Sequence, residues 1–131
     1  MTNKMLEHIK FILIDAINDN IQGMYELNNS VKKYYPELET QNGTDFVCGK
    51  ILSELIAENY VKVFKMTNPE FEKIETINNK IGLTIASDKT NWIEYENEWI
   101  YGIESVDLKK SVELENKLYE KIKTYGNTVY N

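Results

Sequence analysis

The hydrophobic pattern of this chain changes its period near the middle, and that change constrains the fold more than any single motif. In three segments, at about residues 5–17, 25–35 and 44–58, apolar side chains recur at the helical spacing of about 3.6 residues. From about residue 60 to residue 75 they alternate with polar side chains on both sides of a turn at residues 67–70, which is typical of a β-hairpin. The pattern predicts an α+β fold that begins with three helices and continues directly into a hairpin.

Local signals place the ends of these helices. The main apolar row of the first helix consists of Leu6, Ile9, Leu13 and Ile17. Because neighbouring apolar residues widen this row, we expect the first helix to be buried on more than one side. Pro36 should end the second helix, since the residue before a proline avoids helical angles. Thr44 is a good N-cap for the third helix, with Asp45 favourably placed in the first turn.

After the hairpin, the sequence predicts a short helix, a strand and a long helix. Residues 77–87 form the short helix despite Gly82, residues 99–104 the strand, and residues 106–125 a C-terminal helix that Gly126 would stop. The side chains expected to face inward from this last helix are Leu108, Val112, Leu118, Tyr119 and Ile122. We expect residues 1–131 to form a single domain, because one hydrophobic core is normal at this length.

Two stretches add a family resemblance to this order of elements. The second helix opens with Gly23-Met24-Tyr25-Glu26-Leu27, and the third ends with Ile51-Leu52-Ser53-Glu54-Leu55-Ile56-Ala57-Glu58-Asn59-Tyr60-Val61. Both resemble small winged helix-turn-helix domains, in which the third helix closes on two leucines, an acidic residue and a glycine before the wing. Asn59 stands in the glycine position, and asparagine tolerates the left-handed conformation needed there.

Residues 88–92 and 99–103 look like the Asn-Trp and final-strand region of some uncharacterised bacterial winged-helix proteins. The resemblance implies a winged-helix-like domain with a core at about residues 5–75. An additional helix, a strand and the C-terminal helix follow at about residues 76–125. It implies a fold and does not by itself imply DNA binding.

The composition narrows the cellular setting. The chain has a net charge of −6, all 15 of its basic residues are lysines, and it contains one cysteine and one histidine. Cys48 cannot form a disulfide within the chain, which fits a reducing cytosol. Neither a signal peptide nor an apolar run of membrane-spanning length is recognisable. We therefore expect a cytoplasmic protein that does not enter membranes.

The candidates for nucleophilic catalysis are Cys48 and His8. Cys48 lies on the apolar side of the third helix and His8 on the polar side of the first, so we expect a buried thiol and a surface histidine rather than a catalytic pair. With one residue of each type, a zinc site would have to rely on carboxylates. We expect a protein that is not an enzyme and has no cofactor or metal. An enzyme with a dispersed carboxylate site stays open as a third alternative.

The third helix would enter the major groove if this chain bound DNA as a winged-helix regulator. Its expected solvent side carries Asp45, Gly49, Lys50, Ser53, Glu54 and Glu58. One lysine among three carboxylates would repel the phosphate backbone, which supplies most of the affinity in such complexes. The lysines that could still contact phosphate are Lys50 and, around the wing, Lys62, Lys65 and Lys73.

A short acidic segment precedes the predicted strand. If it is extended, Glu94, Glu96 and Glu98 project from one face, with Tyr95 and Trp99 on the other. Three interpretations stay open for this face: a solvated acidic surface, a protein-docking surface, and a site for a hard cation. Tyr95 and Trp99 would be anchors in the second of these, because aromatic side chains beside polar groups anchor many interfaces.

We rank non-catalytic protein binding first among the possible functions. A compact acidic chain without arginine is similar in type to the immunity proteins that neutralise basic bacterial toxins such as nucleases, and opposite charge speeds such encounters. The expected docking surface is Glu94, Tyr95, Glu96, Glu98 and Trp99. The alternative is a winged-helix transcription regulator that contacts DNA through the lysines named above. In either case the C-terminal helix could form a homodimer.

Overall fold

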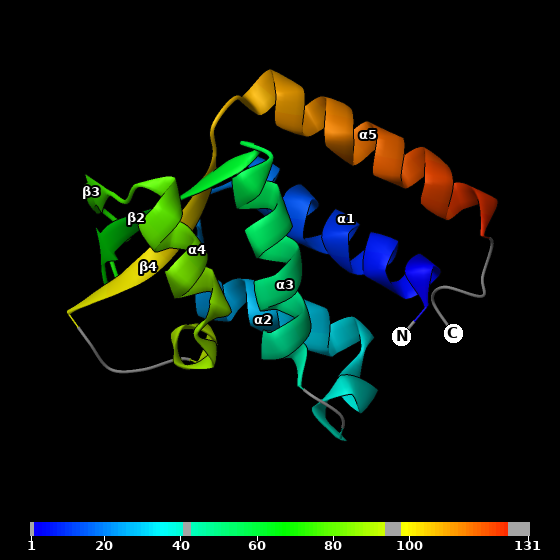
Figure 1. The fold of residues 1–131 in the computed structure, drawn as a ribbon, viewed down its shortest axis with the longest axis horizontal. Helices are drawn as coiled ribbons and strands as arrows, with labels where there is room; N and C mark the ends of the chain where they lie inside the picture. Colours follow the sequence, from blue (N-terminus) through cyan, green and yellow to red (C-terminus); the bar gives the residue numbers. More distant parts are fainter. Residues whose placement is uncertain (1, 41–42, 94–97, 126–131) are drawn as a thin grey trace.

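Helices separate most of the strands in the sequence, and strands that are distant in the sequence pair within one sheet. The computed structural model describes residues 2–40, 43–93 and 98–125 (Figure 1). Its α+β fold comprises α1 (Asn3–Asp19), β1 (Gln22–Gly23), α2 (Met24–Tyr34), α3 (Thr44–Ala57), β2 (Val61–Thr67), β3 (Lys73–Thr76), α4 (Asn79–Ser87), β4 (Trp99–Ser105) and α5 (Leu108–Thr124), with 3₁₀ helices at Pro36–Thr40 and Lys89–Trp92. The predicted helices and strands occur in the expected order, including α4, while the short strand β1 was not predicted.

The sheet has the strand order β1-β4-β2-β3, and its pairs are antiparallel. The predicted hairpin exists as β2 and β3, but β3 is a four-residue edge strand with every residue exposed. β4, expected as an addition to the fold, instead lies inside the sheet and pairs with β2 from Val61↔Ser105 to Thr67↔Trp99. The apolar residues Ile100 and Ile103 suit an interior strand, whereas the Lys73–Thr76 segment suits an edge that meets solvent.

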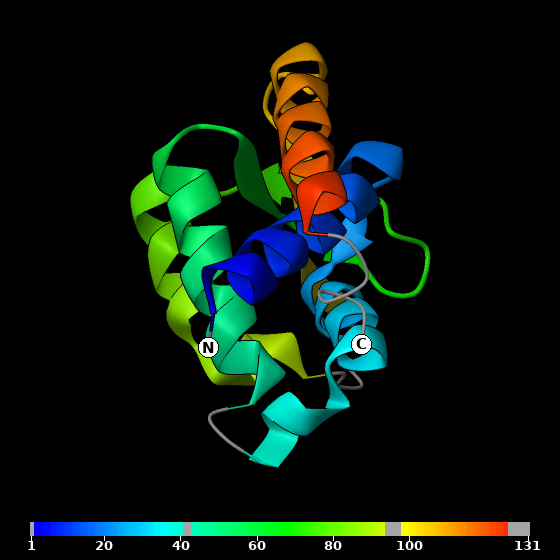
Figure 2. The same ribbon diagram turned by 90° about the vertical axis from the view of Figure 1, so that its right-hand side faces the viewer.

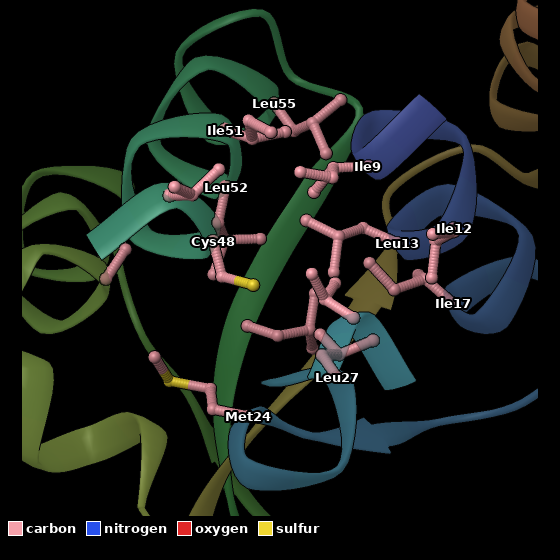
Figure 3. Packing of buried hydrophobic residues seen from close by; sticks show 14 of the residues in the cluster. Ile9, Ile12, Leu13, Ile17, Met24, Leu27, Cys48, Ile51, Leu52 and Leu55 are labelled. Atoms are coloured by element: carbon pink, nitrogen blue, oxygen red, sulfur yellow. The ribbon is translucent and has the colours of Figure 1, made fainter. Parts of the chain in front are cut away.

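The main core lies where α1, α2 and α3 meet one face of the sheet (Figure 3). α1 contributes buried residues from several of its sides, as expected from its wide apolar row, and α3 faces it with Cys48, Leu52 and Leu55. Burying each large aliphatic side chain contributes about 1.5–3 kcal/mol before entropy is subtracted. This core fixes the position of α3 against the sheet.

α4 packs beside α3, and the two helices run side by side in both ribbon views (Figures 1 and 2). Gly49 permits this approach, because a Cβ atom there would lie 2.6 Å from the carbonyl oxygen of Ala86. Trp92 closes the same contact by donating from Nε1 to that oxygen at 2.8 Å. The side of α3 that carries Gly49 is therefore covered by α4 and Trp92.

A second, smaller cluster occupies the other face of the sheet. Phe64, Met66 and Ile100 are its buried members. Their side chains lie over Gly102, where an added Cβ would fall 2.7 Å from the Phe64 ring and 2.8 Å from the Met66 sulfur. Because Gly102 has no side chain, the side chains of Phe64 and Met66 can extend over the backbone of β4.

Two details of the backbone test the local predictions. Asn59 has φ of 62°, so the left-handed conformation expected in the glycine position is confirmed. The predicted cap of α3 is wrong: Gly43, with φ of 84°, occupies the N-cap and Thr44 is the first helical residue, fully buried. The turn before α3 needs a positive φ that threonine rarely adopts, which moves the cap one residue earlier.

α5 lies along α1 (Figures 1 and 2). Leu118 and Ile122 are buried, as predicted, together with Ser111. The prediction is wrong for Leu108, Val112 and Tyr119, which are 54%, 39% and 49% exposed. They follow a neighbouring line of the helix, where the Tyr119 ring meets only the rim of α1, with its centroid 6.1 Å from that of Phe11. The homodimer contact through this helix stays a prediction. Gly126, expected as the helix stop, lies outside the described residues.

Candidate functional site

The two candidate catalytic residues are placed in the core. Cys48 is fully buried, and burial raises the pKa of its thiol to about 12, so the nucleophilic thiolate is not formed near neutral pH. The prediction of a surface His8 is wrong: it is 2% exposed, and its Nδ1 lies 2.6 Å from the Tyr35 hydroxyl. The rings of Tyr34 and Tyr35 pack edge-on against it, and burial lowers its pKa.

Carboxylates meet at the contact between α1 and α5. Asn18 Nδ2 donates to Glu115 Oε1 at 3.0 Å, and the Asp15 carboxyl is hydrogen-bonded to the same glutamate. Burial first, and then the hydrogen bond with Glu115 and repulsion from its charge, raise the pKa of Asp15 to about 6. Among residues 2–40, 43–93 and 98–125, no three His, Cys, Asp or Glu side chains are grouped as metal ligands would be.

The four lysines considered for DNA contact do not form one surface. Lys62 and Lys73 both reach Glu104 Oε1, and Lys62 lies 3.4 Å from it. Lys65 lies on the opposite face of the sheet, because neighbouring residues of a strand alternate in direction. Lys50 is exposed on α3, away from the strands. Because Lys65 also lies over the Trp99 ring, three of the four ammonium groups are engaged within the protein.

The solvent-exposed side of α3, which would contact DNA in a winged-helix regulator, is also narrower than predicted. Gly49 is buried under α4, and Ser53 donates its hydroxyl to the Gly49 carbonyl at 2.7 Å. The exposed side chains that follow along the helix are Lys50, Glu54 and Glu58. The exposed face still carries two carboxylates and one lysine, as expected, but α4 covers the side of the helix at Gly49.

The acidic segment expected to dock a partner is described only at its end. Glu94, Tyr95 and Glu96 lie outside the described residues. Glu98 is exposed, and Trp99 is half-buried at the start of β4. Glu98 and Trp99 lie at one end of the sheet, where Trp99 pairs with Thr67, the last residue of β2.

Two further acidic residues, Glu70 and Glu72, lie in a turn at the same end of the sheet as Glu98 and Trp99. The turn between β2 and β3 lies against the start of β4, since the Asn68 amide donates to the Glu98 carbonyl at 3.0 Å. This turn carries Glu70 and Glu72, both exposed. We call Glu70, Glu72, Glu98 and Trp99 the acidic sheet end. The sequence places Glu70 in the turn and Glu72 at the start of the second hairpin strand, but only the pairing of β2 with β4 brings this turn to Glu98.

Trp99 has ordered neighbours on its own face of the sheet. The Tyr101 ring meets it edge-on with centroids 5.1 Å apart, and the Lys65 ammonium lies 4.0 Å from the Trp99 ring centroid. Such a contact is an electrostatic attraction between a cation and the negative face of the ring. Tyr101 and Lys65 in this role are residues that the sequence did not single out.

Comparisons with protein-family models, with curated proteins and with solved structures found no match. In the described part of the chain, none of the helices has the length and apolar character needed to cross a membrane.

Proposed function

We propose that this protein is a non-catalytic protein-binding module that docks a basic protein through the acidic sheet end. One observation carries the proposal: the backbone hydrogen bond of 3.0 Å from the Asn68 amide to the Glu98 carbonyl joins the turn that carries Glu70 and Glu72 to the segment that carries Glu98. Glu70, Glu72 and Glu98 are all exposed, so their charge extends into solvent. A local group of like charges on a chain of net charge −6 attracts a basic surface from a distance and speeds association.

The class of partner we favour is a basic toxin, such as a nuclease, that this chain would neutralise in the manner of an immunity protein. The support is the charge and the aromatic anchor: Trp99 is half-buried at the start of β4 and would add contact area there. The buried free thiol of Cys48 suits the reducing cytoplasm, where we place the complex.

We infer that the fold is winged-helix-like, with β2 and β4 as the strands of the wing. In support, α1, α2 and α3 precede an antiparallel pair, and Asn59 has the left-handed conformation expected before a wing. β3 and α4 are then an insertion between the two strands. The wing lysines do not favour a DNA-binding role, because Lys62 and Lys73 are engaged by Glu104 and Lys65 by Trp99.

A capture experiment with matched charge variants tests the proposal. Immobilised wild type, Glu72→Lys/Glu98→Lys and the control Glu54→Lys/Glu58→Lys would be incubated with lysate of the source cell, and the bound proteins quantified by mass spectrometry. We expect a basic protein that wild type and the α3 control retain and the sheet-end variant loses. Equal retention by the sheet-end variant would contradict the proposal.

A titration of short random-sequence duplex DNA at low salt tests the alternative. Because phosphate contacts dominate such binding, a regulator would show saturable binding that falls with added salt. We expect no saturable binding. Binding that is lost in Lys50→Glu would instead favour the winged-helix regulator.

A further inference from the structure

The Trp99 ring already holds an ammonium group, supplied by the protein itself. Lys65 Nζ lies 4.0 Å from the ring centroid, the shortest of the lysine–aromatic contacts among the described residues. Tryptophan has the strongest attraction for cations among aromatic side chains. Lys65 is therefore a stand-in that shows which chemistry this ring face accepts.

Two of the other lysine–aromatic contacts do not offer an exchangeable site. Phe64, under Lys73, is fully buried, and Lys73 is also held by Glu104. Lys110, over Tyr60, also donates to the Glu58 carbonyl at 3.0 Å. Trp99 is half-buried and stands at the end of β4, where a partner can approach.

We propose that the Trp99 ring, with Tyr101 at its edge, is a binding site for a lysine side chain of a partner protein, which takes the place of Lys65. The inference rests on the proposed function and names the chemical group recognised within it. On the ring's own face of the sheet, the Glu75 carboxylate is exposed and stands opposite Lys65. The ring face supplies the contact, and the net charge of −6 favours a cationic partner.

The displaced Lys65 has a second acceptor within reach. Glu75 on β3 stands directly opposite Lys65 in the sheet register and is exposed. Directly opposite side chains of an antiparallel pair lie on one face and interact. Lys65 can thus leave the ring for the Glu75 carboxylate without losing its electrostatic partner. The exchange replaces one internal contact by another, which keeps the site available to an incoming lysine.

The test uses a small ligand, so it does not depend on the identity of the partner. Nα-acetyl-lysine amide would be titrated into ¹⁵N-labelled protein, and the indole N–H signals followed by NMR. The chain contains two tryptophans, and Trp92 serves as an internal control because its indole N–H is held by the Ala86 carbonyl. The matched ligand control is the same compound acetylated on Nε, which has no positive charge.

We expect the Trp99 signal to shift with the charged ligand and not with the acetylated one. Lys65→Met keeps an unbranched side chain but removes the competitor, and should lower the apparent dissociation constant roughly tenfold, as for a site that Lys65 fills about nine-tenths of the time. Trp99→Leu in the Lys65→Met background should abolish the perturbation of Tyr101 amide signals. An unchanged Trp92 signal in each variant confirms that the fold is intact.

Two results would overturn the inference: equal shifts with both ligands, or no gain of affinity in Lys65→Met. An arginine amide titration gives a further check, since tighter binding than lysine would show that a guanidinium and not an ammonium group is the fitting ligand. The proposed function fails separately, if the sheet-end charge variant still retains its protein partner while Trp99 binds lysine amide as expected.

Discussion

α3 and the acidic sheet end both expose acidic side chains, but they differ in what surrounds those charges. On α3, Gly49 is buried under α4, and the exposed side chains Lys50, Glu54 and Glu58 occupy the part of the helix surface that α4 leaves open. At the sheet end, Glu70, Glu72 and Glu98 come from a turn and a strand start with no described helix over them. The comparison teaches that exposure of a helix face follows from what packs beside it, and that a docking surface can form where two chain segments meet.

Gly49→Ala gives the largest effect expected and tests whether α4 is fixed on α3. The new methyl group would lie 2.6 Å from the backbone oxygen of Ala86, which cannot turn away. We expect a loss of about 3 kcal/mol in the free energy of unfolding, the upper part of the range for overpacking. Urea unfolding measures it, with Lys50→Ala as the exposed neighbour expected to change stability by less than about 0.5 kcal/mol. An undiminished stability would mean that α4 moves freely from α3.

Gly102→Ala tests the packing of the sheet in the same way, with a smaller effect. The nearest atoms to the new methyl group are the Phe64 ring carbon and the Met66 sulfur, at 2.7 Å and 2.8 Å. These are ends of side chains that can shift, so we expect a loss of about 1–2 kcal/mol. Unfolding measured under the same conditions should rank this variant below Gly49→Ala in severity. The reverse order would show that the small cluster, and not the α3–α4 contact, is the more rigid of the two.

Asp15→Asn separates charge effects on stability from charge effects on binding. Because the pKa of Asp15 is raised to about 6 from 3.8, the folded state holds this proton more tightly than the unfolded state. Wild-type stability should therefore fall as pH rises from about 4 to about 6, and Asp15→Asn should remove that fall. Since Asp15 is exposed and screened by solvent, the gain at pH 7 should stay below about 1 kcal/mol.

Thermal unfolding at pH 4 and pH 7 measures this effect, with Glu113→Gln on α5 as the control of equal charge change. The unfolding temperatures of Asp15→Asn and wild type should differ at pH 7 and converge at pH 4. Those of Glu113→Gln and wild type should show no such change with pH. Binding to a basic partner should be unaffected, because Asp15 lies at the α1–α5 contact. A variant that loses the partner would place the docking surface on this side of the molecule.

Local sequence signals were sufficient for the elements and for one backbone detail. Hydrophobic period alone predicted the order of helices and strands, and the left-handed Asn59 followed from its position at the end of α3. The burial of His8 could not be predicted from α1, because the tyrosine rings that cover it come from the last residue of α2, Tyr34, and the residue after it, Tyr35. A polar residue on the edge of an apolar row is buried or exposed according to its neighbour in space.

The candidate site was predictable only in part for the same reason. Glu98 and Trp99 were identified from the acidic and aromatic pattern of residues 94–99, which the structure describes from residue 98 onward. Glu70 and Glu72 were missed because strand pairing is a long-range property: the alternating pattern indicates a strand but does not name its partner. The same pairing brings Lys65 to Trp99 across two residues of the ladder.

The most direct test of this account is the association rate of the captured basic protein with two variants of equal charge change, one in each of the compared regions. Stopped-flow mixing at low ionic strength would compare Glu72→Lys/Glu98→Lys with Glu54→Lys/Glu58→Lys. We expect the first to slow association by about tenfold or more and the second by less than about twofold, with the difference shrinking as salt is added. Equal slowing by both variants, or slowing by the α3 variant alone, would contradict docking through the acidic sheet end.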